Sequence, residues 1–140
     1  MTVSIDSNVV VALWWQHDPL NRVAEKMLLQ AQRTGRLVVS APVYAELMGD
    51  PNRTEAEIDR FLDETGIQID WELNQSVWRQ AGSAYRSYTL RCRTGDRSVP
   101  RGILADFLIG AHALVSGYSL LTLDRRLFHA AFPKLPILAI

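Results

Sequence analysis

The chain has 140 residues, a mass of 15.8 kDa, 15 basic against 15 acidic residues and a formal net charge of +0. The length suits one domain, since domains most often hold about 100–150 residues, and the 48% hydrophobic content excludes a disordered or collagenous chain. The longest apolar run has seven residues against the ~20 that span a bilayer, and the single Cys92 excludes an internal disulfide. The first residues lack the basic and apolar regions of a signal peptide, so we expect none. We expect one soluble cytoplasmic domain over residues 1–140, without membrane contact.

Short apolar runs alternate with helical segments along the chain. Five runs are interpreted as strands: Thr2–Ile5, Leu37–Val39, Ile67–Ile69, Ser119–Thr122 and Ile137–Leu138. They are mostly apolar rather than alternating, which is typical of a parallel sheet covered by helices on both faces. The sequence therefore predicts an α/β fold.

Helical segments lie between these strands. The predicted helices are Val9–Trp15, Pro19–Arg33, Pro42–Met48, one that begins at the capping box Thr54–Glu57, Leu73–Leu90 and Ile103–Val115. Gly35 is a predicted helix stop, and Pro42 suits a first helical position. Arg93–Gly102 is a predicted loop, and the helix after it is apolar nearly all round, so it should be buried.

Four acidic residues fall where strands end or helices begin. Asp6 follows the first strand, Glu46 lies one turn into the helix after the second, and Asp106 is in the first turn of the buried helix; Asp124 follows the fourth strand. Because the carboxyl ends of parallel strands share one edge, we expect the four to meet in one crevice. Two unit charges ~4 Å apart repel by ~4 kcal/mol, so protons or a cation must be present, and oxygen ligands favour Mg²⁺ or Mn²⁺.

Each acid also has a structural explanation when taken alone. Asp6 and Asp124 suit helix N-caps, and Glu46 suits a solvated or arginine-paired helix position. Asp106 lies between apolar residues, so it needs a partner, which is either Arg101 or a metal. Because independent caps need not all fall at one edge of the sheet, we favour the metal site.

Arginine supplies 13 of the 15 basic residues. Residues 86–101 contain one acid, Asp96, and five arginines, which gives this stretch a local charge of +4: Arg86, Arg91, Arg93, Arg97 and Arg101. A guanidinium binds phosphate in a bidentate manner, so the four that border Asp106 in sequence, residues 91, 93, 97 and 101, are candidates for binding a nucleic-acid phosphate. A solvated helix face and loop is the alternative.

Four segments resemble those of PIN-domain ribonucleases. The opening strand with Asp6-Ser7-Asn8 is similar to their Asp-x-Asn, and the other three are Ser40–Leu47, Leu104–Ala113 and Leu121–Phe128. The resemblance runs from residue 3 to about 138 with all four acids in order, and the size points to the VapC toxins of type II toxin–antitoxin pairs. It implies a three-layer α/β/α sandwich with a central parallel five-stranded sheet.

The resemblance also implies an activity. The chain would be a Mg²⁺- or Mn²⁺-dependent endoribonuclease that cleaves structured RNA (tRNA or rRNA) with a metal-activated water. Asp6, Glu46, Asp106 and Asp124 would bind the metal or orient its waters, while Asn8 and Thr122 would hold carboxylates by hydrogen bonds. Family members form homodimers and are inhibited by a cognate VapB-type antitoxin.

Three alternatives remain open at this point. A receiver-like Mg²⁺-binding signalling domain would use Asp70, after the third strand, as its phosphoacceptor, but Lys134 precedes the last strand rather than ending it. A haloacid-dehalogenase-type phosphatase needs an acid where Asn8 stands. A non-catalytic interaction module would have no reason to keep all four acids. His112 faces the apolar helix and is expected to be a core residue.

Overall fold

The computed structural model describes residues 1–94 and 103–138, without the side chains of residues 93 and 94. In these residues a parallel sheet has four strands in the order β3-β2-β1-β4: β1 (Thr2–Ile5), β2 (Arg36–Ser40), β3 (Ile67–Asp70) and β4 (Ser119–Leu121). All four coincide with predicted strands to within one residue at each end. β1 and β2 are therefore the central strands, and Asp6 follows a strand with neighbours on both sides.

The prediction of a fifth strand is wrong. Ile137–Leu138 forms a single parallel bridge, from Ile137 to Leu120 of β4, rather than a ladder. Two hydrogen bonds hold it there, from the Leu120 amide to the Pro136 carbonyl and from the Leu138 amide to the Leu120 carbonyl, each 2.9 Å. Pro136 has no N–H, so it cannot extend the ladder on its N-terminal side.

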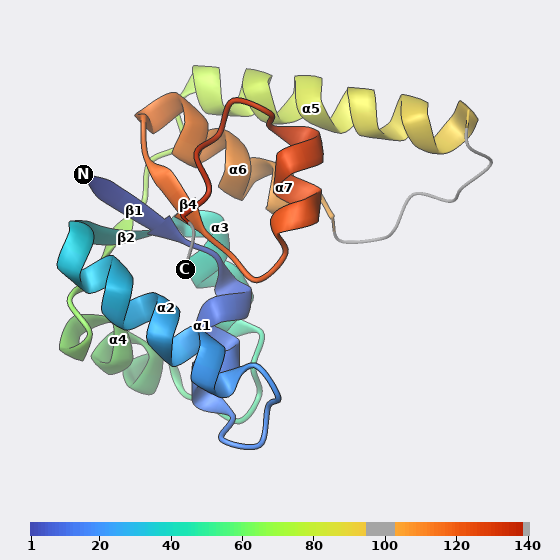
Figure 1. Cartoon of the computed structure of the whole chain (residues 1–140). Coiled ribbons are helices and arrows are strands. Elements are labelled where there is room, and N and C mark those ends of the chain that lie inside the picture. Colours follow the sequence, from blue (N-terminus) through green and yellow to red (C-terminus); the bar gives the residue numbers. More distant parts are fainter. Residues whose placement is uncertain (95–102, 139–140) are drawn as a thin grey trace.

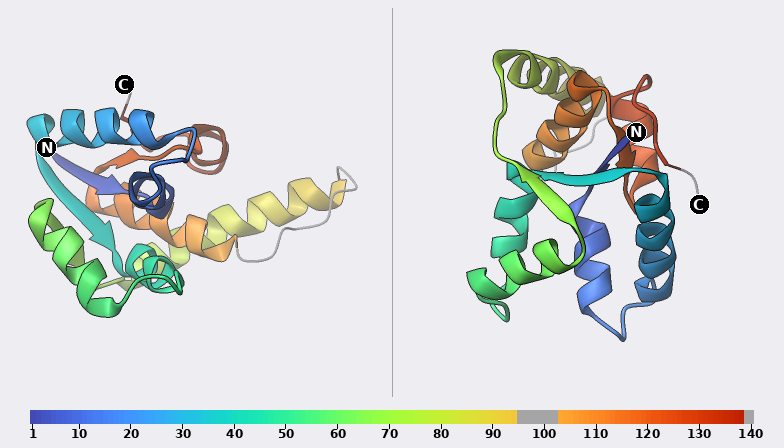
Figure 2. Two further views of the ribbon diagram at one scale, coloured as in Figure 1. Left: turned by 90° about the horizontal axis from the view of Figure 1, so that it is seen from below. Right: turned by 90° about the vertical axis from the view of Figure 1, so that its left-hand side faces the viewer.

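Seven helices cover the sheet in the part of the chain that is described: α1 (Ser7–Trp14), α2 (Asn21–Thr34), α3 (Ala41–Met48), α4 (Glu55–Glu64), α5 (Gln75–Thr94), α6 (Leu104–Ser116) and α7 (Arg125–Ala131). Figure 2 shows α2 and α7 on one side of the sheet and α3, α5 and α6 on the other. The C-terminal half of α5 projects away from the body (Figure 1). No helix among the described residues is both long and apolar enough to cross a bilayer.

Local signals in the sequence set three of the helix ends at or next to the predicted residues, whereas α5 runs to Thr94, past the predicted end at Leu90 and into the predicted loop Arg93–Gly102. Gly35 is the C-cap of α2, Pro42 lies in the first turn of α3, and Thr54 with Glu57 forms the capping box of α4. These signals fix helix boundaries because they satisfy or remove backbone donors that have no partner inside the helix.

Helix α6 contains a continuous run of buried residues. Seven consecutive residues, 107–113, are buried, and the ring of Phe107 packs against those of Tyr85, Tyr88 and Phe132. Gly110 lets α6 approach Phe132 closely, since a Cβ at this position would lie 2.6 Å from Cδ2 of that ring. This packing holds the first turn of α6, and with it Asp106, at a fixed position beside the sheet.

Candidate metal centre

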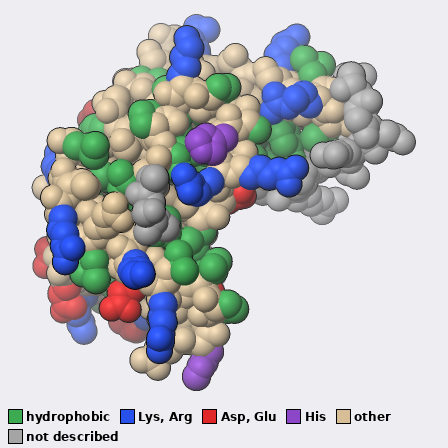
Figure 3. Space-filling model, viewed as in Figure 1, with side chains coloured by type: hydrophobic (Ala, Val, Ile, Leu, Met, Phe, Trp, Pro, Cys, Tyr) green, Lys and Arg blue, Asp and Glu red, His purple; other side chains and the backbone are tan. Residues whose placement is uncertain are grey.

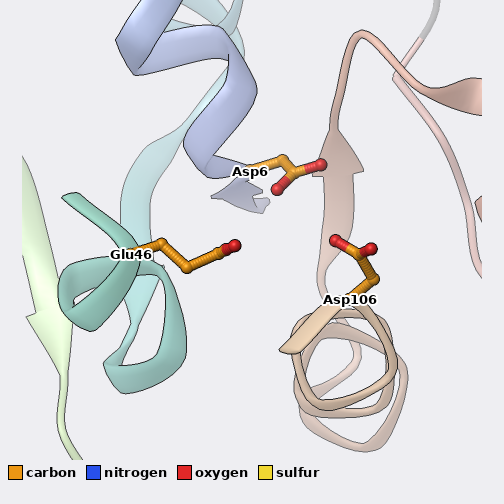
Figure 4. Close-up of side chains that lie close together, drawn as sticks. All are labelled: Asp6, Glu46 and Asp106. Carbon is orange, nitrogen blue, oxygen red and sulfur yellow. The ribbon is translucent and has the colours of Figure 1, made fainter. Parts of the chain in front are cut away.

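Three acidic side chains from three elements meet at the carboxyl end of the sheet. Asp6 follows β1, Glu46 lies on α3, and Asp106 lies in the first turn of α6. One carboxylate oxygen from each lies within 4.8 Å of the other two, and Figure 4 shows the three side chains pointing toward one another. Asp6 is buried, Asp106 is half-buried and Glu46 is exposed, so the cluster opens to solvent on the side of α3.

Asp124 does not join this group. Its carboxylate accepts a hydrogen bond from the Leu127 amide at 3.3 Å and caps α7, the structural role considered for it in the sequence. Asp6, by contrast, occupies the N-cap position of α1 but makes no side-chain cap hydrogen bond, so its carboxylate is directed elsewhere. Asp124 remains close enough for its charge to raise the pKa of both Asp6 and Asp106.

A buried hydroxyl holds the Asp6 carboxylate. Thr122 Oγ1 donates to Asp6 Oδ2 at 2.8 Å and accepts from the backbone amide of Asp124 at 3.0 Å. Asn8 Nδ2 lies 3.4 Å from the same hydroxyl, and Asn8 Oδ1 accepts from the Leu123 amide at 3.1 Å. Asn8 and Thr122 therefore tie the residues after β4 to the residues after β1.

Ser7, for which no role was predicted, also belongs to the centre. Its Oγ donates to Glu46 Oε1 at 2.9 Å and lies 3.5 Å from Asp6 Oδ1. The hydroxyl thus links two carboxylates that are 40 positions apart in the chain. The one available signal was a hydroxyl residue next to an acid at a strand end, which is common in turns and caps.

Burial and mutual repulsion raise the pKa values of two of the three acids. Loss of hydration raises the pKa of Asp6 to about 6, although the Thr122 hydrogen bond lowers it, and the charge of Glu46 raises it further. Loss of hydration, followed by the charges of Asp6, Glu46 and Asp124, raises the pKa of Asp106 to about 7. A nearby cation favours the charged form of an acid and would reverse both shifts.

No basic side chain among residues 1–92 and 103–138 supplies that cation. The ion pairs there join Arg53 to Asp50 and His112 to Asp70, and none involves Asp6, Glu46 or Asp106. Three carboxylates within reach of one point, two with raised pKa, are a donor set that fits a hard divalent cation such as Mg²⁺ or Mn²⁺. Arg101, considered as a partner for Asp106, lies outside the described residues.

The arginine stretch is placed only in part. Arg91 is exposed on α5, with its guanidinium carbon 6.0 Å from the centre of the Tyr88 ring. The side chain of Arg93, and all of Arg97 and Arg101, lie outside the described residues, as does most of the predicted loop. A role in binding phosphate remains a prediction for all four arginines.

His112 is a core residue, as expected, but it has a partner. Its side chain is 1% exposed, and Nε2 lies 2.7 Å from Asp70 Oδ2 at the end of β3. Asp70 therefore belongs to an edge strand, two positions from β1 in the sheet, and is paired with a histidine. This arrangement removes the main support for a receiver-like domain, which was Asp70 as a phosphoacceptor after the third strand.

We predict that Thr122→Val weakens the centre while preserving the shape of the core. The change removes the hydroxyl that donates to Asp6 and leaves the Asp124 amide without its acceptor. The expected cost is about 1–3 kcal/mol in the free energy of unfolding, measured with urea, together with weaker Mg²⁺ binding by calorimetry. Thr122→Ser keeps the hydroxyl and should retain Mg²⁺ affinity; equal Mg²⁺ affinity in both variants would contradict this role.

Comparisons with known proteins bear on the whole chain. The family model of the PIN domain matches residues 3–133. The solved structure of VapBC-1 from nontypeable Haemophilus influenzae is similar with a TM-score of 0.68 and 20% identity, covering 99% of this chain and 97% of that one. The structure of VapBC2 from Rickettsia felis, bound to a DNA fragment from its promoter, is similar with a TM-score of 0.69 and 17% identity, over 99% of this chain and 98% of that one. The structure of FitAcB from Neisseria gonorrhoeae has a TM-score of 0.60 and 16% identity, over 98% of this chain and 96% of that one. No match was found among the curated proteins. At these identities the solved structures show a shared fold.

Proposed function

Because the chain belongs to the PIN domain family, we propose that it is a Mg²⁺- or Mn²⁺-dependent endoribonuclease. The substrate we propose is structured RNA, such as a loop of tRNA or rRNA. The observation that carries the proposal is the meeting of Asp6, Glu46 and Asp106 within 4.8 Å at the carboxyl end of a parallel sheet. This is the edge at which open α/β folds bind ligands.

The side chains of the centre would have different roles in binding the metal and positioning water. Asp6, Glu46 and Asp106 would hold the metal, and Asp124, whose charge reaches the cluster, would orient water at its rim. When bound, the metal supplies a Lewis acid at the phosphodiester and an activated water as nucleophile. Thr122 and Ser7 fix the rotamers of Asp6 and Glu46 by donating to them. No histidine of the described residues lies in the cluster, so we expect water, not a side chain, to attack.

We further propose that the chain is the toxin of a type II toxin–antitoxin pair, with a VapB-type antitoxin as its partner. The fold that it shares with the VapBC and FitAcB structures supports this. Three exposed apolar residues also support it: Trp15 and Leu20, in the connection between α1 and α2, are 49% and 44% exposed, and Val23 of α2 is 38% exposed. Such residues are available for a contact with another chain, here the antitoxin or a second copy in a homodimer.

A cleavage assay tests the activity. The purified chain, freed of metal with a chelator, should leave a folded tRNA intact and cut it at defined sites when Mg²⁺ or Mn²⁺ is added. The products should carry 5′-phosphate and 3′-hydroxyl ends. Cleavage that persists in excess chelator would contradict metal dependence, and an intact RNA under every metal condition would favour a non-catalytic interaction module.

Expression in cells tests the toxin assignment separately. Growth should stop when the chain is produced alone and resume when the small protein encoded beside it is produced as well. A double variant, Asp6→Asn with Asp106→Asn, should not stop growth although it is produced to the same level. Growth arrest by the double variant would contradict the link between toxicity and cleavage.

A further inference from the structure

A second concave surface lies at the edge of the sheet, between α4 and β3. The cavity has a volume of about 650 Å³ and shares no residue with the metal centre. It is lined by residues of α3, α4 and β3 and by the residue after β3: Tyr44, Glu55, Asp59, Leu62, Asp63, Ile67, Gln68, Ile69 and Trp71. We call it the β3 groove.

One wall of the β3 groove is acidic. Glu55, Asp59 and Asp63 are exposed and follow one another at intervals of four residues, so they form a stripe along one face of α4. None of them forms an ion pair with a basic residue in the described part of the chain. Arg60, the one basic residue of α4, is not among the residues that line the groove. Figure 3 shows acidic side chains over α4 at the lower left.

Two aromatic residues, Tyr44 and Trp71, also line the groove. Trp71 is 60% exposed, and its ring meets the ring of Tyr44 edge to face at 4.9 Å. The Tyr44 hydroxyl donates to Asp59 Oδ1 at 2.7 Å, which joins the aromatic pair to the acidic stripe. An exposed indole beside carboxylates is a favourable surrounding for a guanidinium or ammonium group, because the ring face and the carboxylates both attract cations.

The floor of the groove is the open edge of the sheet. β3 pairs with β2 on one side, and no strand of residues 1–94 or 103–138 pairs with it on the other. Three consecutive residues of β3, Ile67 to Ile69, line the groove, although neighbouring residues of a strand point to opposite faces. The groove therefore runs along the strand edge, where backbone N–H and C=O groups are available to an added strand.

The distance between every fourth residue of a helix is close to the distance between every second residue of a strand. Residues four apart on a helix are separated by about 6.0 Å along its axis, and residues two apart on a strand by about 6.6 Å. In a strand added to β3, alternate side chains would therefore have nearly the same spacing as Glu55, Asp59 and Asp63. The turn at Gly66, which has a positive φ of 71°, joins α4 to β3 within two residues and sets the two side by side.

From this arrangement we infer that the β3 groove binds an extended segment of a partner protein with basic residues at alternate positions. The segment adds a strand to the free edge of β3, its arginine or lysine side chains pair with the stripe on α4, and one of them packs on Trp71. The inference does not depend on the metal centre or on RNA cleavage.

A labelled synthetic peptide tests the inference with the full-length chain. The peptide has three arginines at alternate positions with valine and threonine between them, and a second peptide of the same composition has the arginines adjacent. Fluorescence anisotropy at low salt should show about tenfold tighter binding of the alternating peptide. On binding, amide hydrogen exchange should slow in β3, because an added strand protects its free edge.

Variants of the chain identify the groove. The triple change Glu55→Gln, Asp59→Asn and Asp63→Asn should weaken binding at least about tenfold, as should Trp71→Ala. Glu64→Gln, an exposed acid of α4 outside the groove, and Asp106→Asn should bind the peptide as the unchanged chain does. Circular dichroism confirms that each variant is folded, and Trp71→Ala alone serves if the triple variant does not fold.

Three results would overturn the inference. The first is equal binding of the two peptides, and the second is unchanged binding to both the triple variant and Trp71→Ala. The third is a change in the oligomeric state of the unliganded protein, measured as its mass in solution, when the stripe is neutralised. The occupant of the groove would then be a second copy of this chain.

Discussion

Replacing Asp106 with Asn is expected to reduce RNA cleavage by about a thousandfold and, at the same time, to stabilise the metal-free protein at pH 8. The loss follows because a metal ion at this site is worth several kcal/mol in the transition state, and each 1.36 kcal/mol is a factor of ten in rate. The gain follows because burial, and then the charges of Asp6 and Glu46, raise the pKa of Asp106, so that its charge at pH 8 is unfavourable in the folded state. Asparagine has nearly the same shape and no charge to repel them.

Single-turnover cleavage with saturating Mg²⁺ measures the first effect, and urea unfolding in a chelator measures the second. Glu64→Gln, which removes an exposed acid of α4, should change neither quantity. A variant that lost activity and was also destabilised would show that Asp106 acts by holding α6 in place. Unchanged cleavage would remove Asp106 from the proposed centre.

The metal-free protein should be about 2 kcal/mol less stable to unfolding at pH 8 than at pH 5. The folded-state pKa values of Asp6 and Asp106, about 6 and about 7, both lie above the 3.8 of an unperturbed aspartate. The folded state therefore binds more protons than the unfolded state between pH 4 and 7, and its stability falls as the pH rises through this window. Between pH 5 and pH 8 the folded state loses its protons over about 1 pH unit at Asp6 and about 2 units at Asp106, which at 1.36 kcal/mol per unit gives about 4 kcal/mol. We halve this because Asp106 is partly screened by solvent.

Mg²⁺ should cancel this loss. A cation bound to the folded state alone stabilises it by about 2.7 kcal/mol at a hundred times its dissociation constant, and protons compete for the same carboxylates. The rise in melting temperature on adding Mg²⁺ should therefore be larger at pH 8 than at pH 5. The double variant, Asp6→Asn with Asp106→Asn, is the control for all other groups of the chain and should show a flatter pH profile. Stability that rises from pH 5 to pH 8 in the unchanged metal-free chain would contradict the shifts.

These two predictions describe one property of the fold. The carboxylates of the centre are held together by Thr122, Ser7 and the buried block of α6 although they repel one another. Sites that bind a charged group are often destabilising to the protein that carries them, because their geometry suits the ligand rather than the free protein. Removal of charge at such a site is expected to trade activity for stability.

The local features of this chain followed from its sequence. Three helix boundaries were predicted from Gly35, Pro42 and Thr54, although α5 extends four residues beyond its predicted end at Leu90. The strands β1 to β4 lie at the predicted positions, with ends shifted by at most one residue. Such features depend on neighbours a few residues away, through capping hydrogen bonds and apolar periodicity, so the order of residues contains them. The order of acids along strand and helix ends was visible for the same reason.

The contacts that complete the centre depend on packing between distant segments. Thr122 and Asp6 are separated by 116 positions, Ser7 and Glu46 by 39, and Asp70 and His112 by 42. Which side chain turns toward which is decided by the approach of α3 and α6 to the sheet, and periodicity within one segment does not contain this information. The tertiary structure likewise decided that Asp124 caps α7 rather than joining the three acids, and that Ile137 forms one bridge instead of a strand. The order of residues fixed where carboxylates leave the strands and helices, because hydrogen bonds between near neighbours set those ends; the distances between the carboxylates came only with the packed core.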